Sequence, residues 1–315
     1  MKHFFDVHDL GSLELALEYA KSVKANPRKG YMKGQHKSIG LLFFNPSLRT
    51  RLSSQRAAQN LGMDAVVLDV GAESWKLEFS DGTIMNGETA EHIKEAAAVM
   101  GAYFDFIAIR AFAGLKDRTY DYSEPVLTAF MQYAGVPIIN MESSTGHPLQ
   151  AFADLLTIEE LKTTARPKVV LTWAPHPRAL PHAVANSFAQ WMNLAEVDLV
   201  ITHPEGYELA PEFVGSARVE MDQRQAFEEA DFIYAKNWSS YSSYGHVLST
   251  DTDWMVNEEK MALTNDAYFM HCLPVRRNVI VSDAVLDSDR SVVIPQAANR
   301  VVSMQTVLSL LLEEH

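Results

Sequence analysis

Two hydroxyl side chains and two arginines lie close together in residues 45–51 (NPSLRTR). Ser47 is suited to cap a helix that begins here, and Thr50 falls in the first turn of that helix. A helix N-terminus presents unpaired N–H groups and the positive end of the helix dipole, so it attracts anions. With Arg49 and Arg51 as charged donors, the segment predicts a site for one phosphate group. The alternative is a capped surface helix whose arginines are solvated.

Arg110 directly follows an apolar run at residues 104–109. Ligands of doubly wound α/β folds bind at the carboxyl ends of parallel strands. Because Arg110 and the 45–51 segment both follow predicted strands, we expect them to converge on one ligand. The alternative is an exposed arginine that pairs with Asp117 or Asp121.

A second polar segment, residues 147–150 (HPLQ), opens another predicted helix, with Pro148 at its first position. His147 and Gln150 can each donate a hydrogen bond to a carbonyl oxygen and so polarise an electrophile. The alternative for His147 is a helix cap or a surface histidine.

Residues 271–278 (HCLPVRRN) follow a further predicted strand and contain Cys272, the single cysteine of the chain. Without a second cysteine a sulfur-rich zinc site is not expected, and we predict no metal. A lone buried thiol is usually inert packing, although a nucleophile is conceivable. We instead expect the backbone carbonyls of Cys272 and Leu273 to accept hydrogen bonds from a substrate amine, with Pro274 holding the turn.

Three other residues are weaker candidates. His176 and Lys236 each follow a predicted strand, and Lys236 is suited to pair with a substrate carboxylate. Trp75 lies in a polar loop at residues 71–82, where a tryptophan either packs on its own domain or reaches a neighbouring subunit. The chain has no G-x-G-x-x-G and no G-x-x-x-x-G-K-[ST] motif, so we expect neither a dinucleotide nor ATP, and no cofactor.

The elements that position these residues alternate between apolar runs and helical patterns. Strands are expected at residues 38–44, 65–69, 104–109, 136–140, 168–172, 198–201, 231–234, 268–271 and 292–294. Helices are expected at residues 51–61, 90–100, 123–133, 148–161, 180–192, 223–230 and 296–312. This alternation predicts an α/β fold of two domains, each a mostly parallel sheet flanked by helices, with the active site in the interdomain cleft. The domains are expected at 1–146 and 147–295, with 296–315 packing back on the first.

The composition excludes several classes of protein. The chain has 315 residues, of which 27 are basic and 40 acidic, and its net charge of −13 argues against non-specific nucleic-acid binding. No apolar run reaches the roughly 18 residues that span a bilayer, so no membrane association is expected. The first residues show no pattern of a signal peptide, and one cysteine suits a reducing compartment. We therefore expect a cytoplasmic protein.

In this order, the motifs S-x-R-T-R, R, HPxQ and HCLP resemble the carbamoyltransferase (transcarbamylase) family over the length of the chain. The resemblance implies that the first domain binds carbamoyl phosphate and the second binds an amino acceptor, without a cofactor. It implies His147, Arg110 and Cys272 as the catalytic residues. It also implies a homotrimer in which a loop containing Trp75 completes a site shared with the next subunit. The implied contacts of carbamoyl phosphate are Ser47, Leu48, Arg49, Thr50, Trp75, Arg110, His147, Gln150, Cys272, Leu273 and Arg300.

Within the family, residues 238–245 (WSSYSSYG) lack the S-M-G motif by which ornithine enzymes bind free ornithine. The chain resembles the branch that acts on N-acylated ornithine in its ESW loop and in the segments MES, AKNW and HCLPVRRN. This implies acyl-ornithine contacts from Glu142, His176, Lys236, Arg276 and Ala90. Ala90 is neutral where the acetyl branch has a glutamate that would repel a succinyl carboxylate, although Glu88 and Glu91 lie beside it.

The resemblance thus implies carbamoyl transfer from carbamoyl phosphate to the δ-amine of N-succinyl-L-ornithine. The products are N-succinyl-L-citrulline and phosphate, in arginine biosynthesis. An N-acetylornithine enzyme, and then an ordinary ornithine enzyme, are the alternatives. An alternative of another class is a non-catalytic protein that binds a phosphate metabolite.

Overall fold

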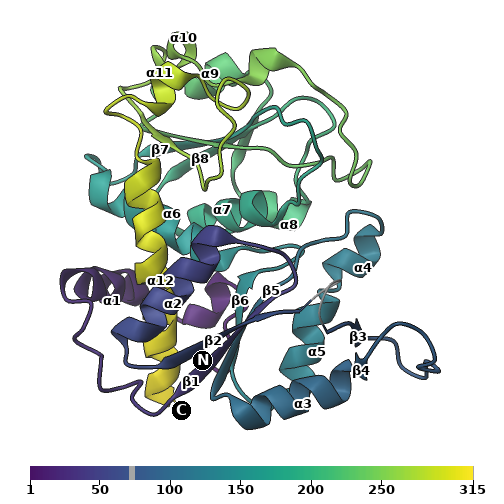
Figure 1. The fold of residues 1–315 in the computed structure, drawn as a ribbon. Helices are drawn as coiled ribbons and strands as arrows, with labels where there is room; N and C mark the ends of the chain where they lie inside the picture. The colour runs from purple at the N-terminus through teal and green to yellow at the C-terminus, as the bar shows by residue number, and fades with distance from the viewer. Residues whose placement is uncertain (71–74, 315) are drawn as a thin grey trace. The chain divides into compact units, whose positions relative to one another are not determined.

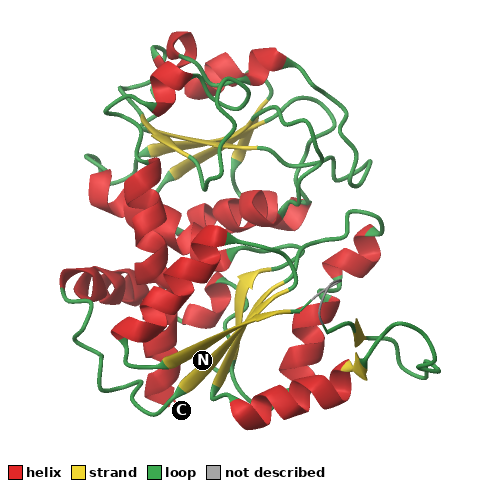
Figure 2. Cartoon of the chain, in the orientation of Figure 1, coloured by secondary structure: helices red, strands yellow, loops and turns green. Residues whose placement is uncertain are grey.

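The computed structural model describes residues 1–70 and 75–314, and the chain divides into two compact units (Figures 1 and 2). Unit 1 comprises Met1–Gly114, Thr119–Leu149 and the chain from Arg300 onwards. Unit 2 comprises Leu115–Arg118 and Gln150–Asn299. Among the described residues, no helix is both long and apolar enough to cross a membrane.

Unit 1 is built on a parallel sheet in the order β2-β1-β5-β6. Strands β1, β5 and β6 are buried at nearly every position, which explains why the sequence shows continuous apolar runs there. Strand β2 is at the edge and is more exposed. The four strands are β1 (Ser38–Phe43), β2 (Asp64–Asp69), β5 (Phe106–Arg110) and β6 (Ile138–Glu142).

Helices cover both faces of this sheet (Figure 1). Helices α3 and α5 pack together on one face, where Ile93, Phe130 and Ile107 belong to one buried cluster. Helix α2 packs on the strands of the other face. The helices of this half of the chain are η1 (Val7–Leu10), α1 (Leu13–Ala25), α2 (Leu48–Asn60), α3 (Ile93–Tyr103), α4 (Arg118–Tyr122) and α5 (Pro125–Tyr133). The pair β3 (Leu77–Glu78) and β4 (Glu91–His92) forms a small separate sheet.

Unit 2 has a parallel sheet in the order β11-β10-β7-β8-β9. Helices α6 and α7 supply aromatic packing, with Phe152 stacked on Trp191 at 5.0 Å and Phe188 against Tyr234 at 4.2 Å between ring centroids. The strands are β7 (Lys168–Trp173), β8 (Asp198–Thr202), β9 (Arg218–Glu220), β10 (Phe232–Lys236) and β11 (Tyr268–Met270). The helices of this half of the chain are α6 (Pro148–Leu161), α7 (Ala183–Leu194), α8 (Pro211–Val214), α9 (Gln223–Phe227), η2 (Thr252–Trp254), α10 (Glu258–Met261), α11 (Asp283–Leu286) and α12 (Val293–Glu314), and α12 belongs to unit 1 from Arg300 onwards.

One predicted strand is wrong. Residues 292–294 do not form a strand, because helix α12 already begins at Val293. Val292 and Val293 are buried, and Val293 joins the apolar cluster of the unit 2 sheet, whereas Ile294 is 69% exposed. A three-residue apolar run therefore marks the buried entry to a helix here, and periodicity cannot separate that from a short buried strand. Helix α1 and strand β9 were not expected from the sequence.

The strand order reverses direction once in each unit. In unit 1 the chain runs from β1 to β2 and then returns to place β5 on the other side of β1. In unit 2 it runs from β7 through β8 and β9 and then places β10 on the other side of β7. At such a reversal the connections leave in opposite directions and open a crevice at the carboxyl ends of the strands, where ligands bind.

Candidate active site

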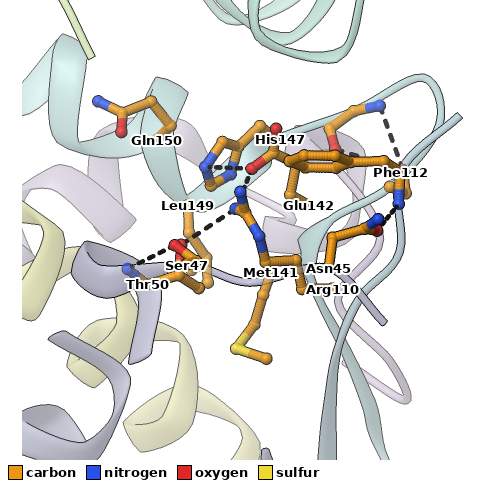
Figure 3. Close-up of polar contacts among 12 residues, drawn as sticks. Asn45, Ser47, Thr50, Arg110, Phe112, Met141, Glu142, His147, Leu149 and Gln150 are labelled. Carbon is orange, nitrogen blue, oxygen red and sulfur yellow. Dashed lines mark hydrogen bonds and ion pairs between the residues drawn. The ribbon is translucent and has the colours of Figure 1, made fainter. Parts of the chain in front are cut away.

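In unit 1 the hydroxyl of Thr50 accepts hydrogen bonds from two arginines, from Arg110, which is drawn in Figure 3, and from Arg300. Ser47 caps helix α2 and accepts a hydrogen bond from the Thr50 backbone N–H at 3.3 Å. Arg110 donates from Nη1 to Thr50 Oγ1 at 3.2 Å, and Arg300 donates from Nη2 to the same oxygen at 2.9 Å. Thr50, Arg110 and Arg300 are all buried. Two guanidinium groups are thus held beside the N-terminus of α2, which is the arrangement that binds a phosphate group.

A carboxylate joins this group of cations. Glu142 Oε2 accepts a hydrogen bond from Arg110 Nη1, and His147 Nε2 lies 3.2 Å from the same oxygen. Arg110 and Glu142 are the last residues of the adjacent strands β5 and β6, and they are partners in the sheet register. The Arg110 guanidinium also lies over the ring of Phe112, 4.4 Å from its centroid. Thr50, Arg110, Glu142, His147 and Arg300 form what we call the phosphate cradle.

The loop that leads to His147 is held by Glu124, a residue that the sequence did not single out. The buried carboxylate of Glu124 accepts hydrogen bonds from the Thr145 backbone and hydroxyl, at 2.7 and 2.5 Å. It also accepts from the hydroxyl of Ser143 at 2.7 Å and from the backbone N–H of Ser144 at 3.2 Å. Burial raises the pKa of Glu124 despite these donors. No motif pointed to Glu124, because it lies 19 to 21 positions away in sequence from the residues it binds.

Three predicted residues of the first helical turn lie in different surroundings. Leu48 is 68% exposed, and Arg49 is half-buried. Arg51 is turned to a neighbouring strand, where it pairs with Asp69 and lies over the ring of Phe43. In this structure Arg51 therefore contacts Asp69 at the end of β2, whereas Arg110 and Arg300 contact Thr50. The exposed alternative for Arg110 is wrong, since its side chain is buried against Glu142.

Trp75 and Ala90 lie together at the small sheet of β3 and β4. Trp75 is 51% exposed and donates from Nε1 to Glu91 at 2.8 Å, while Ala90 is bonded through its backbone N–H to the Lys76 carbonyl at 2.9 Å. Lys76 also forms an ion pair with Glu88. Both acidic neighbours of Ala90 are therefore engaged by side chains of the opposing segment, and Ala90 itself is exposed between them.

In unit 2, basic residues gather where the strand order reverses. His176 follows β7, and Lys236 ends β10, the neighbouring strand. Arg276 donates from Nε to His176 Nε2 at 3.0 Å. The Nδ1 atom of His176 lies 2.8 Å from the Arg178 carbonyl oxygen and 3.1 Å from the Arg178 backbone nitrogen. Because Arg276 Nε can only donate, Nε2 must be the acceptor, and we assign the proton to Nδ1. Burial, followed by Lys236 and Arg276 among the causes, lowers the pKa of His176 and favours this neutral form.

The turn formed by residues 271–274 follows β11 and is held by side chains. Its first backbone N–H, that of His271, donates to Gln296 Oε1 at 3.0 Å, and the Leu273 N–H donates to His271 Nδ1 at 2.8 Å. Leu273 has φ of +54°, a left-handed conformation that costs a non-glycine residue energy. Cys272 is half-buried. The N–H groups of His271 and Leu273 in this turn thus both have side-chain acceptors.

Gln150 belongs to the same unit and is fully enclosed. Its Nε2 donates to Asp154 Oδ1 at 2.7 Å, and Gln296 Nε2 donates to the same oxygen at 2.6 Å. Burial and then the nearby Asp154 and Cys272 raise the pKa of Tyr234 well above its ordinary value. No motif singled out Gln296 in the sequence, although it stands in the QAANR segment that contains Arg300.

Comparisons with known families match both units. Residues 2–160 match the carbamoyl-phosphate-binding domain of aspartate/ornithine carbamoyltransferases, and residues 181–311 match the aspartate/ornithine-binding domain of the same enzymes. The chain is 57% identical to N-succinylornithine carbamoyltransferase of Bacteroides thetaiotaomicron over 315 residues, 99% of each chain. It is 39% identical to N-acetylornithine carbamoyltransferase of Xylella fastidiosa strain Temecula1, over 99% of this chain and 98% of that one.

A similar solved structure is that of N-acetyl-L-ornithine transcarbamylase in which a glutamate is replaced by alanine, complexed with carbamoyl phosphate and N-succinyl-L-norvaline. The TM-score is 0.92 at 39% identity, and the match covers 99% of this chain and all of the other. The family models, the full-length relatives and the fold thus agree with the motifs. The chain belongs to the aspartate/ornithine carbamoyltransferase family.

Proposed function

We propose that the protein transfers the carbamoyl group of carbamoyl phosphate to the δ-amine of N-succinyl-L-ornithine, giving N-succinyl-L-citrulline and phosphate. The chain is 57% identical to a succinylornithine enzyme and 39% identical to an acetylornithine enzyme, each over 99% of its length. The higher identity to the succinylornithine enzyme supports this acceptor. The neutral side chain of Ala90, which the resemblance places at the acyl end, is consistent with a succinyl carboxylate. The reaction is a step of arginine biosynthesis in the family.

Carbamoyl phosphate is assigned to the phosphate cradle and the first turn of α2. Ser47, Leu48, Arg49 and Thr50 supply the donors of the helix N-terminus, and Arg110 and Arg300 supply charge. His147, Gln150 and Arg110 are assigned to the carbamoyl carbonyl. Charge-assisted hydrogen bonds to a dianion are stronger than neutral ones, so a buried pair of arginines suits this substrate.

The acylated ornithine is assigned to Glu142, His176, Lys236 and Arg276, with Ala90 near its acyl end. Arg276 and Lys236 are cations suited to the carboxylates of the acceptor, and neutral His176 orients Arg276. The carbonyls of Cys272 and Leu273 are assigned to the δ-amine. By this proposal residues 1–146 supply most contacts of the donor, residues 147–295 supply most contacts of the acceptor, and residues 296–315 complete the first domain.

In the reaction the neutral δ-amine attacks the carbamoyl carbon and forms a tetrahedral intermediate. The C–O bond to phosphate then breaks, the phosphate leaves with that electron pair, and the amine proton passes to the leaving phosphate. His147 and Arg110 stabilise the negative charge that develops on the carbonyl oxygen. Carbamoyl phosphate is already activated, so the protein contributes orientation and charge stabilisation and needs no cofactor.

We further propose a homotrimer in which Trp75 completes the site of a neighbouring subunit. Its 51% exposure leaves the indole available, and the bond to Glu91 holds it in a defined position. A cytoplasmic location is proposed on the ground of the single cysteine.

The acceptor is tested by comparing turnover of carbamoyl phosphate with N-succinylornithine, N-acetylornithine and free ornithine at equal concentration. We expect the highest kcat/KM with N-succinylornithine. Preference for N-acetylornithine would move the enzyme to the other acyl branch, and preference for free ornithine would refute an acylated acceptor. Binding of carbamoyl phosphate without turnover of any of the three would support the non-catalytic binder.

A Thr50→Val substitution is expected to lower kcat/KM for carbamoyl phosphate at least tenfold. It keeps the shape of the side chain and removes the one oxygen that Arg110 and Arg300 share. Each hydrogen bond from a charged group is worth about 1.5–3 kcal/mol, so losing two exceeds the roughly 1.4 kcal/mol of a tenfold change. Steady-state kinetics at saturating acceptor measure this effect.

Thr264→Val is the matched control. Thr264 donates to the Met261 carbonyl and accepts from the Ala267 N–H, but it lies outside the assigned site. We expect unchanged kcat/KM in this variant. Equal losses in the two variants would mean that Thr50 acts only through stability.

A further inference from the structure

Gln296 joins two segments of unit 2 that the proposed function places at the reacting group. Its amide oxygen accepts from the His271 N–H, the first backbone donor of the 271–274 turn, at 3.0 Å. Its amide nitrogen donates to Asp154 Oδ1 at 2.6 Å, and Gln150 donates to that same oxygen. One glutamine thus uses both ends of its amide to connect the turn with the side chain of Gln150.

The connection is buried throughout. Gln296 and Asp154 are each 0% exposed and Gln150 is 1% exposed. In such surroundings a polar group that loses its partner pays its full desolvation cost, so the three side chains have few other arrangements open to them. A buried hydrogen-bonded network of this kind therefore restricts rotamers more than a surface network does.

The turn that Gln296 holds is one that needs an anchor. Leu273 has φ of +54°, and its N–H bond to His271 Nδ1 spans only two residues. A second constraint on the start of the turn comes from Gln296, which is 25 residues away along the chain. Loss of this acceptor lets the backbone of the turn relax toward ordinary φ values, and the carbonyls of Cys272 and Leu273 change direction with it.

We propose that Gln296 is a positioning residue of the transferase reaction. Through Asp154 it fixes the direction of the Gln150 amide, and through His271 it fixes the carbonyls of the 271–274 turn. The two groups that face the carbamoyl carbon and the attacking amine then keep one mutual geometry. The inference rests on the proposed function, because that function assigns Gln150 and the turn to the substrates.

The test is Gln296→Glu, which keeps an oxygen for the His271 N–H and replaces the donor to Asp154 by a second carboxylate. We expect kcat to fall at least tenfold, while calorimetry shows the affinity for inorganic phosphate unchanged within twofold. Asp154→Asn in the same chain supplies an amide donor and is expected to recover at least threefold of the lost kcat. A kcat within twofold of wild type in Gln296→Glu would overturn the proposal.

Gln305→Glu is the matched control in the same helix. Gln305 is also buried, donates from Nε2 to the Pro27 carbonyl at 2.6 Å and accepts from Asn60 at 2.9 Å. Neither Pro27 nor Asn60 is an assigned site residue, so we expect this variant to have a lowered melting temperature and an unchanged kcat. An equal loss of kcat in Gln305→Glu would show that Gln296 acts only through packing of α12 and would overturn the proposal.

Two further measurements keep the test decisive. If Gln296→Glu does not fold, Gln296→Met removes both bonds without adding charge and is expected to show the same tenfold loss of kcat. Each ratio is measured with whichever of the three acceptors the wild-type enzyme carbamoylates fastest. An error in the proposed acceptor then changes only the substrate that is used in the assay. An error in the proposed role of Gln296 instead gives a ratio of variant kcat to wild-type kcat close to one.

Discussion

In phosphate-free buffer we expect the free energy of unfolding of a Glu142→Gln variant to be about 3 kcal/mol lower than that of wild type. The reason is that removing one partner of a buried ion pair leaves the other charge uncompensated. The carboxylate of Glu142 lies between Arg110 and His147, and all three side chains are buried. We also expect kcat to fall at least tenfold, because Glu142 orients both groups. Chemical denaturation and steady-state kinetics measure the two effects.

Added phosphate distinguishes a charge effect from a packing effect. If the cradle binds the phosphate group, the anion restores negative charge beside Arg110, and a ligand at a hundred times its Kd adds about 2.7 kcal/mol to the native state. Wild type gains such a contribution as well, but there Glu142 already supplies a negative charge, so we expect phosphate to bind Glu142→Gln more tightly and thereby to recover most of the loss. A loss that phosphate leaves unchanged would contradict the cradle as the anion site.

The control is Asp287→Asn, which breaks a pair of similar type at the surface. Asp287 binds Arg277 at 2.6 Å, with both side chains well exposed to solvent. Exposed pairs contribute about 0.2–1 kcal/mol, so this variant should lie within that range and should not respond to phosphate.

The second large effect is expected at Ala90. Ala90→Glu should reverse the acyl preference, lowering kcat/KM for N-succinylornithine relative to N-acetylornithine by roughly a hundredfold. Two carboxylates about 5 Å apart at an effective dielectric of about 20 repel by roughly 3 kcal/mol, which corresponds to that factor. Paired assays with the two acyl-ornithines measure the ratio.

Ala90→Gln separates charge from size. Glutamine has the length of glutamate without its charge, so we expect it to lower turnover of the bulkier succinyl substrate only modestly and to keep the order of preference. The backbone bond from Ala90 to Lys76 is unaffected by either side chain. An unchanged preference in Ala90→Glu would place the acyl end away from this position and would refute the assignment of Ala90.

The sequence predicted the elements well where their signals are local. Strands β1 and β7 are continuous apolar runs, and helix α6 occupies residues 148–161 as its proline start and apolar spacing indicated. Ser47 caps α2 because its hydroxyl accepts a hydrogen bond from the backbone N–H of Thr50 in the first turn of the helix. This signal is local, since the two residues are three positions apart. The error at 292–294 arose where the run was too short to show a period.

The sequence by itself also determined which residue types are available for the chemistry, and motif order was enough to indicate the family. It could not determine which of them touch. Arg51 and Arg110 are equally good candidates in the chain, yet Arg51 pairs with Asp69 and Arg110 with Glu142. Strand order and register decide this, since Arg110 and Glu142 face each other only because β5 and β6 are neighbours.

The tertiary structure alone decided the supporting contacts. Thr50 and Arg300 are 250 residues apart, and Gln296 and Asp154 are 142 apart. No local pattern encodes such pairs, because they form only when packing brings distant segments together and desolvation then makes each buried polar group bond to a neighbour. The chain sequence therefore determined the chemical groups and their local geometry, and the packed fold determined their partners.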